Sequence, residues 1–120
     1  MEISSLLGKT IVSIKGEKGD KEMLFSTSDG KNYRFFHDQD CCELVRIEDI
    51  TGDLQDLIGE PLLRAEEESN NEGFSPVPEY LDSWTWTFYK FSTRKGYVDI
   101  RWLGESNGYY GEKVELEEVQ

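Results

Sequence analysis

The sequence predicts a mainly β domain (β-rich α+β): an antiparallel sandwich or a partly closed barrel of about eight strands, with one or two short helices. Most segments alternate apolar and polar residues with period two, which is typical of strands that bury one face. Turns containing glycine separate these segments, and the second half of the chain repeats short stretches of the first.

The repeated stretches occur in the same order in both halves. Residues 6–12, 25–30 and 45–50 correspond to residues 57–63, 91–96 and 114–119. The offset between matching stretches grows along the chain, from 51 to 66 to 69 residues. One duplicated unit with insertions therefore accounts for all three matches. We therefore expect a single domain over residues 1–120, with one pseudo-repeat at about 4–52, a second at about 53–120, and a pseudo-twofold axis between them.

The element boundaries follow from the alternation and the turn signals. Strands are expected at residues 9–15, 22–27, 32–37, 44–50, 61–67, 83–93, 96–103 and 112–119. Asp29-Gly30 fits a hairpin turn, since such pairs supply the positive φ angles that the turn requires. A short helix is expected at residues 51–59, capped by Asp53 and ended by Gly59. Residues 68–82, rich in Ser, Asn, Gly and Pro, predict an exposed loop.

The chain is strongly acidic, with 25 Asp and Glu against 13 Lys and Arg and a formal net charge of −12. A field of this sign opposes binding to nucleic-acid phosphates and to anionic membrane surfaces, and it favours a basic protein partner. No stretch approaches the roughly 18 apolar residues of a membrane span, and the N-terminus lacks the pattern of a signal peptide. We therefore expect a cytoplasmic protein, with its oligomeric state left open.

Residues 37–43 contain the only histidine and both cysteines. Zinc and iron take such ligands, and the candidates for a metal site are His37, Asp38, Asp40, Cys41 and Cys42. Adjacent cysteines lack the usual spacing of about two to four residues between zinc ligands. The alternative is an ordinary turn that buries one thiol and in which His37 forms hydrogen bonds. We expect no bound cofactor.

Cys41 and Cys42 are neighbours, and neighbouring Cα atoms lie about 3.8 Å apart, closer than the roughly 4.4–6.8 Å of most disulfides. We therefore expect two free thiols, as in a reducing cytosol. A thiolate–imidazole pair with His37 would require proximity in space, which closeness in sequence does not establish. The chain has no other catalytic motif, and a non-enzymatic protein is expected.

Contacts with a partner are expected from aromatic residues on strand 83–93 and on the loop at 104–111, the counterpart of residues 37–43. In a half-buried strand both faces cannot be core, so one aromatic face should be exposed unless the helix or the long loop covers it. The predicted partner-binding residues are Trp84, Tyr89, Tyr109 and Tyr110, with the carboxylates Glu66, Glu67, Glu68, Glu115 and Glu117 for a basic surface.

Two motifs, HDQDCCE at residues 37–43 and GESNGYY at residues 104–110, resemble DUF7448, a family of small domains of unknown function in phage and bacterial genomes. The resemblance extends over most of the chain from Gly30 onward. The family has no assigned chemistry, so no catalytic or binding role carries over. The resemblance implies a small accessory protein, encoded by a phage and acting in the host cytoplasm.

The expected function is a non-catalytic, acidic protein-interaction module: a phage accessory protein or an inhibitor of a host defence or nucleic-acid-binding protein. Two alternatives remain open. One is a metal-binding protein centred on residues 37–42, and the other is a virion or assembly component that associates through its sheet edges.

Overall fold

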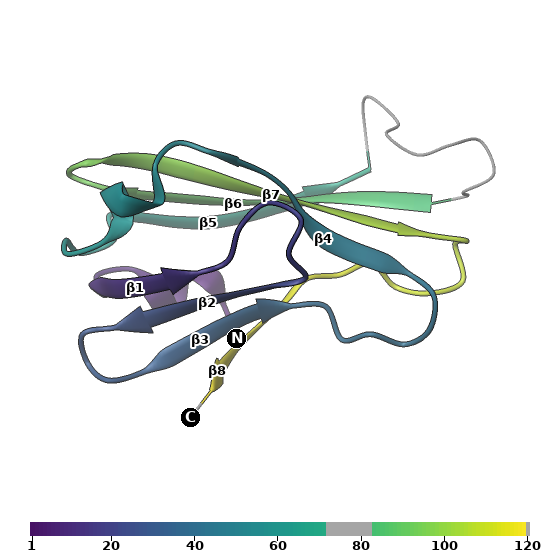
Figure 1. Cartoon of the computed structure of the whole chain (residues 1–120), viewed down its shortest axis with the longest axis horizontal. Helices are drawn as coiled ribbons and strands as arrows, with labels where there is room; N and C mark the ends of the chain where they lie inside the picture. The colour runs from purple at the N-terminus through teal and green to yellow at the C-terminus, as the bar shows by residue number, and fades with distance from the viewer. Residues whose placement is uncertain (72–82, 120) are drawn as a thin grey trace.

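A computed structural model of the chain, which describes residues 1–71 and 83–119, shows two four-stranded antiparallel sheets packed face to face (Figure 1). In the first sheet the order is β1 (Ile11–Lys15), β2 (Glu22–Thr27), β3 (Asn32–Phe36) and β8 (Glu115–Val119). In the second it is β4 (Leu44–Thr51), β7 (Gly96–Ser106), β6 (Ser83–Thr93) and β5 (Arg64–Asn70). Over the described residues this confirms the mainly β prediction and selects an open sandwich instead of a closed barrel.

The last strand of each half of the chain crosses to the other sheet. β1, β2 and β3 are neighbours, but β4 pairs with β7. Likewise β5, β6 and β7 are neighbours, whereas β8 pairs with β3. If β1, β2, β3 and β8 are replaced by their counterparts β5, β6, β7 and β4, the strand order of the first sheet becomes that of the second sheet, read in reverse. Two fused repeats would produce this correspondence, and the duplication itself stays a prediction.

Backbone hydrogen bonds join the two halves at matching places. The Gly8 N–H donates to the carbonyl of Leu62, and the Gly59 N–H donates to the carbonyl of Ile11, both at 2.9 Å. The two donors, Gly8 and Gly59, are 51 residues apart, and so are the two acceptors, Ile11 and Leu62. This is the offset of the first repeated stretch. Both glycines have positive φ angles, 82° and 91°, which other residues rarely adopt.

The helix expected at residues 51–59 is a single 3-10 turn, η2 (Leu54–Leu57), and a similar turn, η1 (Ile3–Leu6), precedes β1. The predicted cap is confirmed, because the side chain of Asp53 accepts a hydrogen bond from the Gln55 N–H at 2.9 Å. The turn ends at Leu57 because the next residue, Ile58, forms a parallel β-bridge with Ile11.

The fifth strand begins later than expected, at Arg64 instead of residue 61. Pro61 forms an isolated bridge with Thr10, and the Leu62 N–H donates to the carbonyl of Lys9, so these residues bind across the join between the halves. β5 continues to Asn70, where an exposed loop was expected. Residues 72–82 of that expected loop lie outside the described residues.

The core between the sheets is aromatic. Phe25 and Phe35 from the first sheet, and Tyr89 and Phe91 from the second, are at most 1% exposed. Ring centroids lie 5.3 Å apart for Phe25 and Phe91 and 4.9 Å apart for Phe35 and Tyr89, in the tilted and edge-on arrangements that aromatic pairs prefer. The cross-sheet contacts therefore hold the two halves of the chain together.

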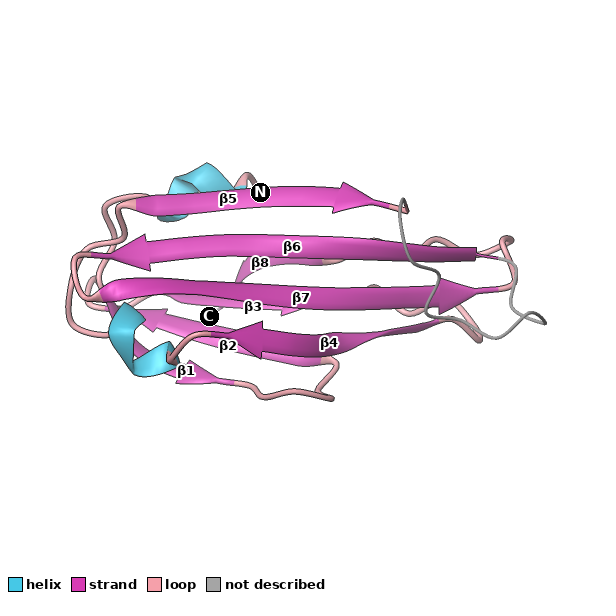
Figure 2. Cartoon of the chain, turned by 90° about the horizontal axis from the view of Figure 1, so that it is seen from above, coloured by secondary structure: helices cyan, strands magenta, loops and turns pink. Residues whose placement is uncertain are grey.

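Seen from above, β5 and β8 lie toward one side of the sandwich, and β1 and β4 lie toward the other (Figure 2). Each side of the sandwich thus ends in one edge strand from each sheet. None of the helices in the described part of the chain has the length and apolar character needed to cross a bilayer.

Replacing either phenylalanine of the cross-sheet pair should destabilise the fold strongly. Phe25→Ala and Phe91→Ala should each lower the free energy of unfolding by about 3–5 kcal/mol, measured by urea denaturation. Because the rings touch, the double variant should lose about 0.5–1.5 kcal/mol less than the sum. Tyr97→Ala, at a residue that is 61% exposed, is the control and should change stability by less than about 0.5 kcal/mol. Strict additivity of the two phenylalanine variants would contradict the contact.

Candidate functional site

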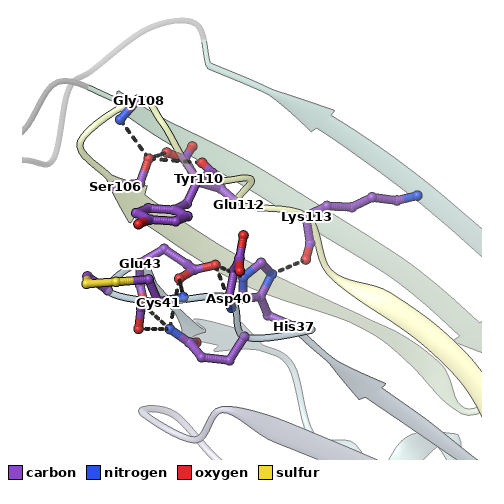
Figure 3. A network of polar contacts seen from close by, with 11 residues as sticks. His37, Asp40, Cys41, Glu43, Ser106, Gly108, Tyr110, Glu112 and Lys113 are labelled. Atoms are coloured by element: carbon purple, nitrogen blue, oxygen red, sulfur yellow. Dashed lines mark hydrogen bonds and ion pairs between the residues drawn. A yellow bond between two sulfur atoms is a disulfide. The ribbon is translucent and has the colours of Figure 1, made fainter.

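Two loops meet at one end of the sandwich, where each half of the chain crosses between the sheets (Figure 3). Residues 37–43 join β3 to β4, and residues 107–114 join β7 to β8. His37 Nδ1 lies 2.6 Å from the carbonyl oxygen of Lys113, which ties the loops to each other. The sequence predicts the second loop at residues 104–111 as the counterpart of the first. In the structure this loop lies three residues later, because β7 extends to Ser106, and the two loops are adjacent.

The carboxylate of Glu43 holds the first loop together. Glu43 is only 4% exposed. Its Oε2 accepts a hydrogen bond from the Asp40 N–H at 3.1 Å and lies 2.8 Å from His37 Nε2. Its Oε1 accepts from the Cys41 N–H at 2.8 Å and from the Gln39 amide at 3.0 Å. Four donors therefore surround one buried carboxylate, as the burial of a charge requires.

The same contacts keep Glu43 ionised. The two ring nitrogens of His37 face the carbonyl oxygen of Lys113 and the carboxylate of Glu43. The hydrogen bond from His37, assisted by the N–H groups of Cys41 and Asp40, lowers the pKa of Glu43 from its ordinary value of 4.5 to about 2. Burial acts in the opposite direction and is outweighed.

A second buried carboxylate, Glu112, organises the other loop and is 7% exposed. Its Oε1 accepts from the Thr85 hydroxyl at 2.7 Å, and its Oε2 accepts from the Ser106 hydroxyl. Ser106 in turn accepts from the Gly108 N–H at 3.0 Å. The backbone of Gly104 passes so close that an added Cβ would lie 2.6 Å from the Cβ of Glu112. This loop is also built around a carboxylate whose oxygens both have donors.

Glu43 and Glu112 occupy matching positions, 69 residues apart, which is the offset of the third repeated stretch. Sequence reasoning misses the burial of both, because glutamate side chains are exposed in most proteins. A signal for them exists: each glutamate precedes a buried valine by two residues, Val45 in the first half and Val114 in the second. If the third repeated stretch is extended toward the N-terminus by two residues, it pairs Glu43 with Glu112.

The outer side of the two loops is exposed to solvent. Tyr109 is 83% exposed and packs edge-on against Tyr110, with ring centroids 5.0 Å apart. Cys41 and Cys42 are exposed on the neighbouring loop. We call these four residues, Cys41, Cys42, Tyr109 and Tyr110, the tip.

The expectation of two free thiols is wrong, because Cys41 and Cys42 are joined by a disulfide. Their Cα atoms lie 3.7 Å apart, as expected for neighbours, and the bond forms in a bend of the loop in spite of this short separation. The sulfur of Cys41 lies on the outer side of its loop, turned away from His37 (Figure 3).

The structure does not bring the five metal-site candidates together as a ligand set. The sulfurs of Cys41 and Cys42 are bonded to each other, and both nitrogens of His37 have other contacts. Asp38 and Asp40 are exposed. Across residues 1–71 and 83–119, no group of three or more His, Cys, Asp or Glu side chains is placed to hold a metal ion.

The prediction of Tyr89 as a contact residue is wrong, since Tyr89 is 1% exposed. Its face of β6 packs against the other sheet, and burial raises the pKa of its hydroxyl well above the ordinary value. The hydroxyl donates to Glu67 at 3.2 Å. Trp84 lies on the opposite face, is half-buried, and pairs with Glu105 near the end of β7 that leads into the tip.

The five predicted contact carboxylates lie on β5 and β8, the edge strands on one side of the sandwich (Figure 2). Each already has a partner within the chain: Glu66 with Arg64, Glu67 with Tyr89, Glu68 with Lys90, Glu115 with Lys113, and Glu117 with Arg34. Exposed ion pairs of this kind contribute little to stability, so these carboxylates can still attract a basic partner.

The loops at residues 37–43 and 107–114 contain most of the two motifs that carry the resemblance described above. A family model, the domain of unknown function DUF7448, matches residues 4–116. The chain belongs to DUF7448. No curated protein and no solved structure matches it significantly. Both crossover loops and both buried glutamates fall within the matched DUF7448 region.

Glu43→Gln should destabilise the DUF7448 domain at neutral pH, because the amide cannot accept from all four donors. Since folding lowers the pKa of Glu43, its ionised form contributes stability above about pH 4.5, and this contribution is lost as the pH falls toward about 2. The difference in unfolding free energy between the wild type and the variant should therefore shrink over that range in urea titrations. Glu118→Gln, at an exposed ion pair, is the control. A difference that is unchanged from about pH 5 to pH 2 would contradict the assignment.

Gly104→Ala should also destabilise the domain, by about 1–3 kcal/mol, because the new methyl group would press on Glu112. The added Cβ would lie 2.6 Å from the Cβ of Glu112 and 2.8 Å from its carbonyl oxygen. Gly111→Ala is the matched control, since a Cβ there meets no atom within 4 Å. Thermal or urea unfolding compares the two variants, and equal effects would argue against the close approach.

Proposed function

We propose that this DUF7448 domain is a non-catalytic protein-interaction module that presents the tip to a protein partner. The observation that carries the proposal is Tyr109, whose side chain is 83% exposed and is backed by the ring of Tyr110. Aromatic residues with a polar end are frequent anchors in protein interfaces, because they bury a large area while the hydroxyl keeps a hydrogen bond.

Polar contacts fix the backbone beneath the two tyrosines. The Tyr109 N–H donates to the side-chain oxygen of Asn107 at 3.0 Å, and the Gly108 N–H donates to Ser106, which binds the buried Glu112. A loop that is already ordered loses less conformational entropy when it binds. The tip is therefore suited to binding with little rearrangement.

The acidic side of the sandwich supports a basic partner. Exposed carboxylates of β5 and carboxylates of β8 lie on edge strands toward the same side of the sandwich (Figure 2), on a chain with a net charge of −12. Such a field accelerates the approach of a positively charged protein and is weakened by salt. It also disfavours direct binding to nucleic acid or to an anionic membrane.

The contacts of His37 support a non-enzymatic role without a cofactor. A nucleophilic cysteine needs a free thiol with a base beside it. In the described structure the cysteine sulfurs are bonded to each other, and His37 is engaged by Glu43 and by the carbonyl of Lys113.

The finer parts of the proposal concern the setting. We propose a cytoplasmic, phage-encoded accessory protein whose partner is a basic host protein of defence or of nucleic-acid binding. The resemblance of both motifs to phage and bacterial sequences, and the acidity of the chain, support this setting. We also propose that the chain arose by duplication, which the exchanged strand order and the paired glutamates support.

Tyr109→Ala should lower the affinity for the partner about 30-fold, as expected for an interface residue worth about 2 kcal/mol. The tagged protein would be used to capture partners from host lysate, and the dominant protein would be purified and titrated by calorimetry. Tyr97→Ala is the matched control, because Tyr97 is also an exposed tyrosine but lies at the opposite end of β7. Equal affinities of the two variants would rule out the tip as the binding surface.

A further inference from the structure

We propose that the Cys41–Cys42 disulfide is a site of thiol–disulfide exchange, and that its acidic surroundings select thiols that carry positive charge. This chemistry belongs to the isolated domain and stands whether or not the tip binds a protein.

The disulfide is accessible and contributes little to holding the fold. Both cysteines are exposed. A disulfide stabilises a protein mainly by restricting the unfolded chain, and the effect grows with the length of the loop that it closes. This bond joins adjacent residues, so it closes the shortest possible loop. Exposed disulfides of this kind are the ones that react readily with thiols.

The loop around the disulfide is held by contacts that do not involve sulfur. The Cys41 N–H donates to Glu43 Oε1 at 2.8 Å. The side-chain amide of Gln39 donates to the carbonyls of Cys41 and Glu43, at 3.0 and 2.7 Å. Reduction therefore leaves two thiols next to each other in a loop that keeps its shape. The chain has no other cysteine, so the bond can only re-form between the same two residues.

The loop that carries the disulfide is rich in carboxylates. Asp38 and Asp40 are exposed on the same loop. The imidazole of His37, on the same loop, is 8% exposed and is directed at the Glu43 carboxylate. On the adjoining loop, Lys113 extends away from the disulfide, with its Nζ 3.9 Å from Glu115 (Figure 3). Because the attacking species is a thiolate, this field should repel anionic thiols and favour those that carry a cation.

The exchange is balanced by two thiols. A thiolate attacks one sulfur of the pair, a new S–S bond forms, and the Cys41–Cys42 bond breaks. Its electron pair leaves on the other sulfur, which takes a proton from water. A second thiolate then attacks the external sulfur of the mixed disulfide, and the second cysteine leaves as a thiolate that also takes a proton from water. Two external thiols are oxidised to one disulfide, and the protein disulfide is reduced to a dithiol.

The first experiment counts thiols by mass spectrometry. Full-length protein prepared without reductant is unfolded and treated with iodoacetamide, before and after reduction. We expect no alkylation before reduction and two alkylated cysteines after it. Two alkylated cysteines in the unreduced protein would overturn the proposal.

The second experiment measures charge selectivity. Reduction rates with 2-aminoethanethiol, 2-mercaptoethanol and 2-mercaptoethanesulfonate are expressed per thiolate and relative to a neutral small-molecule disulfide. At low salt the cationic thiol should react about tenfold faster than the anionic one, at the low end of the range for electrostatic steering. High salt should bring the ratio toward one. A ratio near one at low salt would overturn the selectivity.

Variants locate the source of the selectivity. Asp38→Asn combined with Asp40→Asn should reduce the ratio of the two rates. The matched control, Glu2→Gln combined with Glu118→Gln, removes the same charge from exposed positions near the chain ends and should leave the ratio unchanged. Equal effects of the two pairs would contradict a local field. The salt series on the unaltered protein tests the selectivity even if a variant folds poorly.

Discussion

Each half of the chain sends its fourth strand into the opposite sheet, and the candidate site depends on this crossing. A strand that changes sheets must be preceded by a connection that spans the gap between them. The two connections, at residues 37–43 and 107–114, emerge at the same end of the sandwich and touch through His37 and Lys113. Without the exchange, β3 and β4 could pair through a short hairpin, and this pair of loops would not form.

A connection between two sheets leaves the backbone hydrogen-bond ladder, and its polar groups need other partners. Here a buried glutamate meets that need in each loop. Glu43 collects the N–H groups of Asp40 and Cys41, and Glu112 collects hydroxyl donors that lead on to the Gly108 N–H. A carboxylate suits this role because it accepts several hydrogen bonds at once and gains strength from each in a buried setting.

The buried side of the network determines the exposed side. Because the carboxylates hold the loops from within, Tyr109 and the Cys41–Cys42 disulfide are displayed on an ordered surface. The carboxylates of β5 and β8 lie on a flank of the sandwich and pair weakly with neighbouring cations. The domain thus separates a small contact surface, the tip, from an acidic flank that acts over a longer range.

The sequence by itself determined the layered β architecture, most strand positions, the cap at Asp53 and the two loops that form the site. These features rest on local patterns: alternation, turn residues and spacing. The tertiary structure alone decided which face of β6 is buried, so Tyr89 became core while Trp84 stayed half-exposed. It also decided the adjacency of the loops, the burial of Glu43 and Glu112, and the disulfide. These properties depend on pairing between residues far apart in the chain, or on the bend of a loop, and neither is encoded in the alternation of side chains.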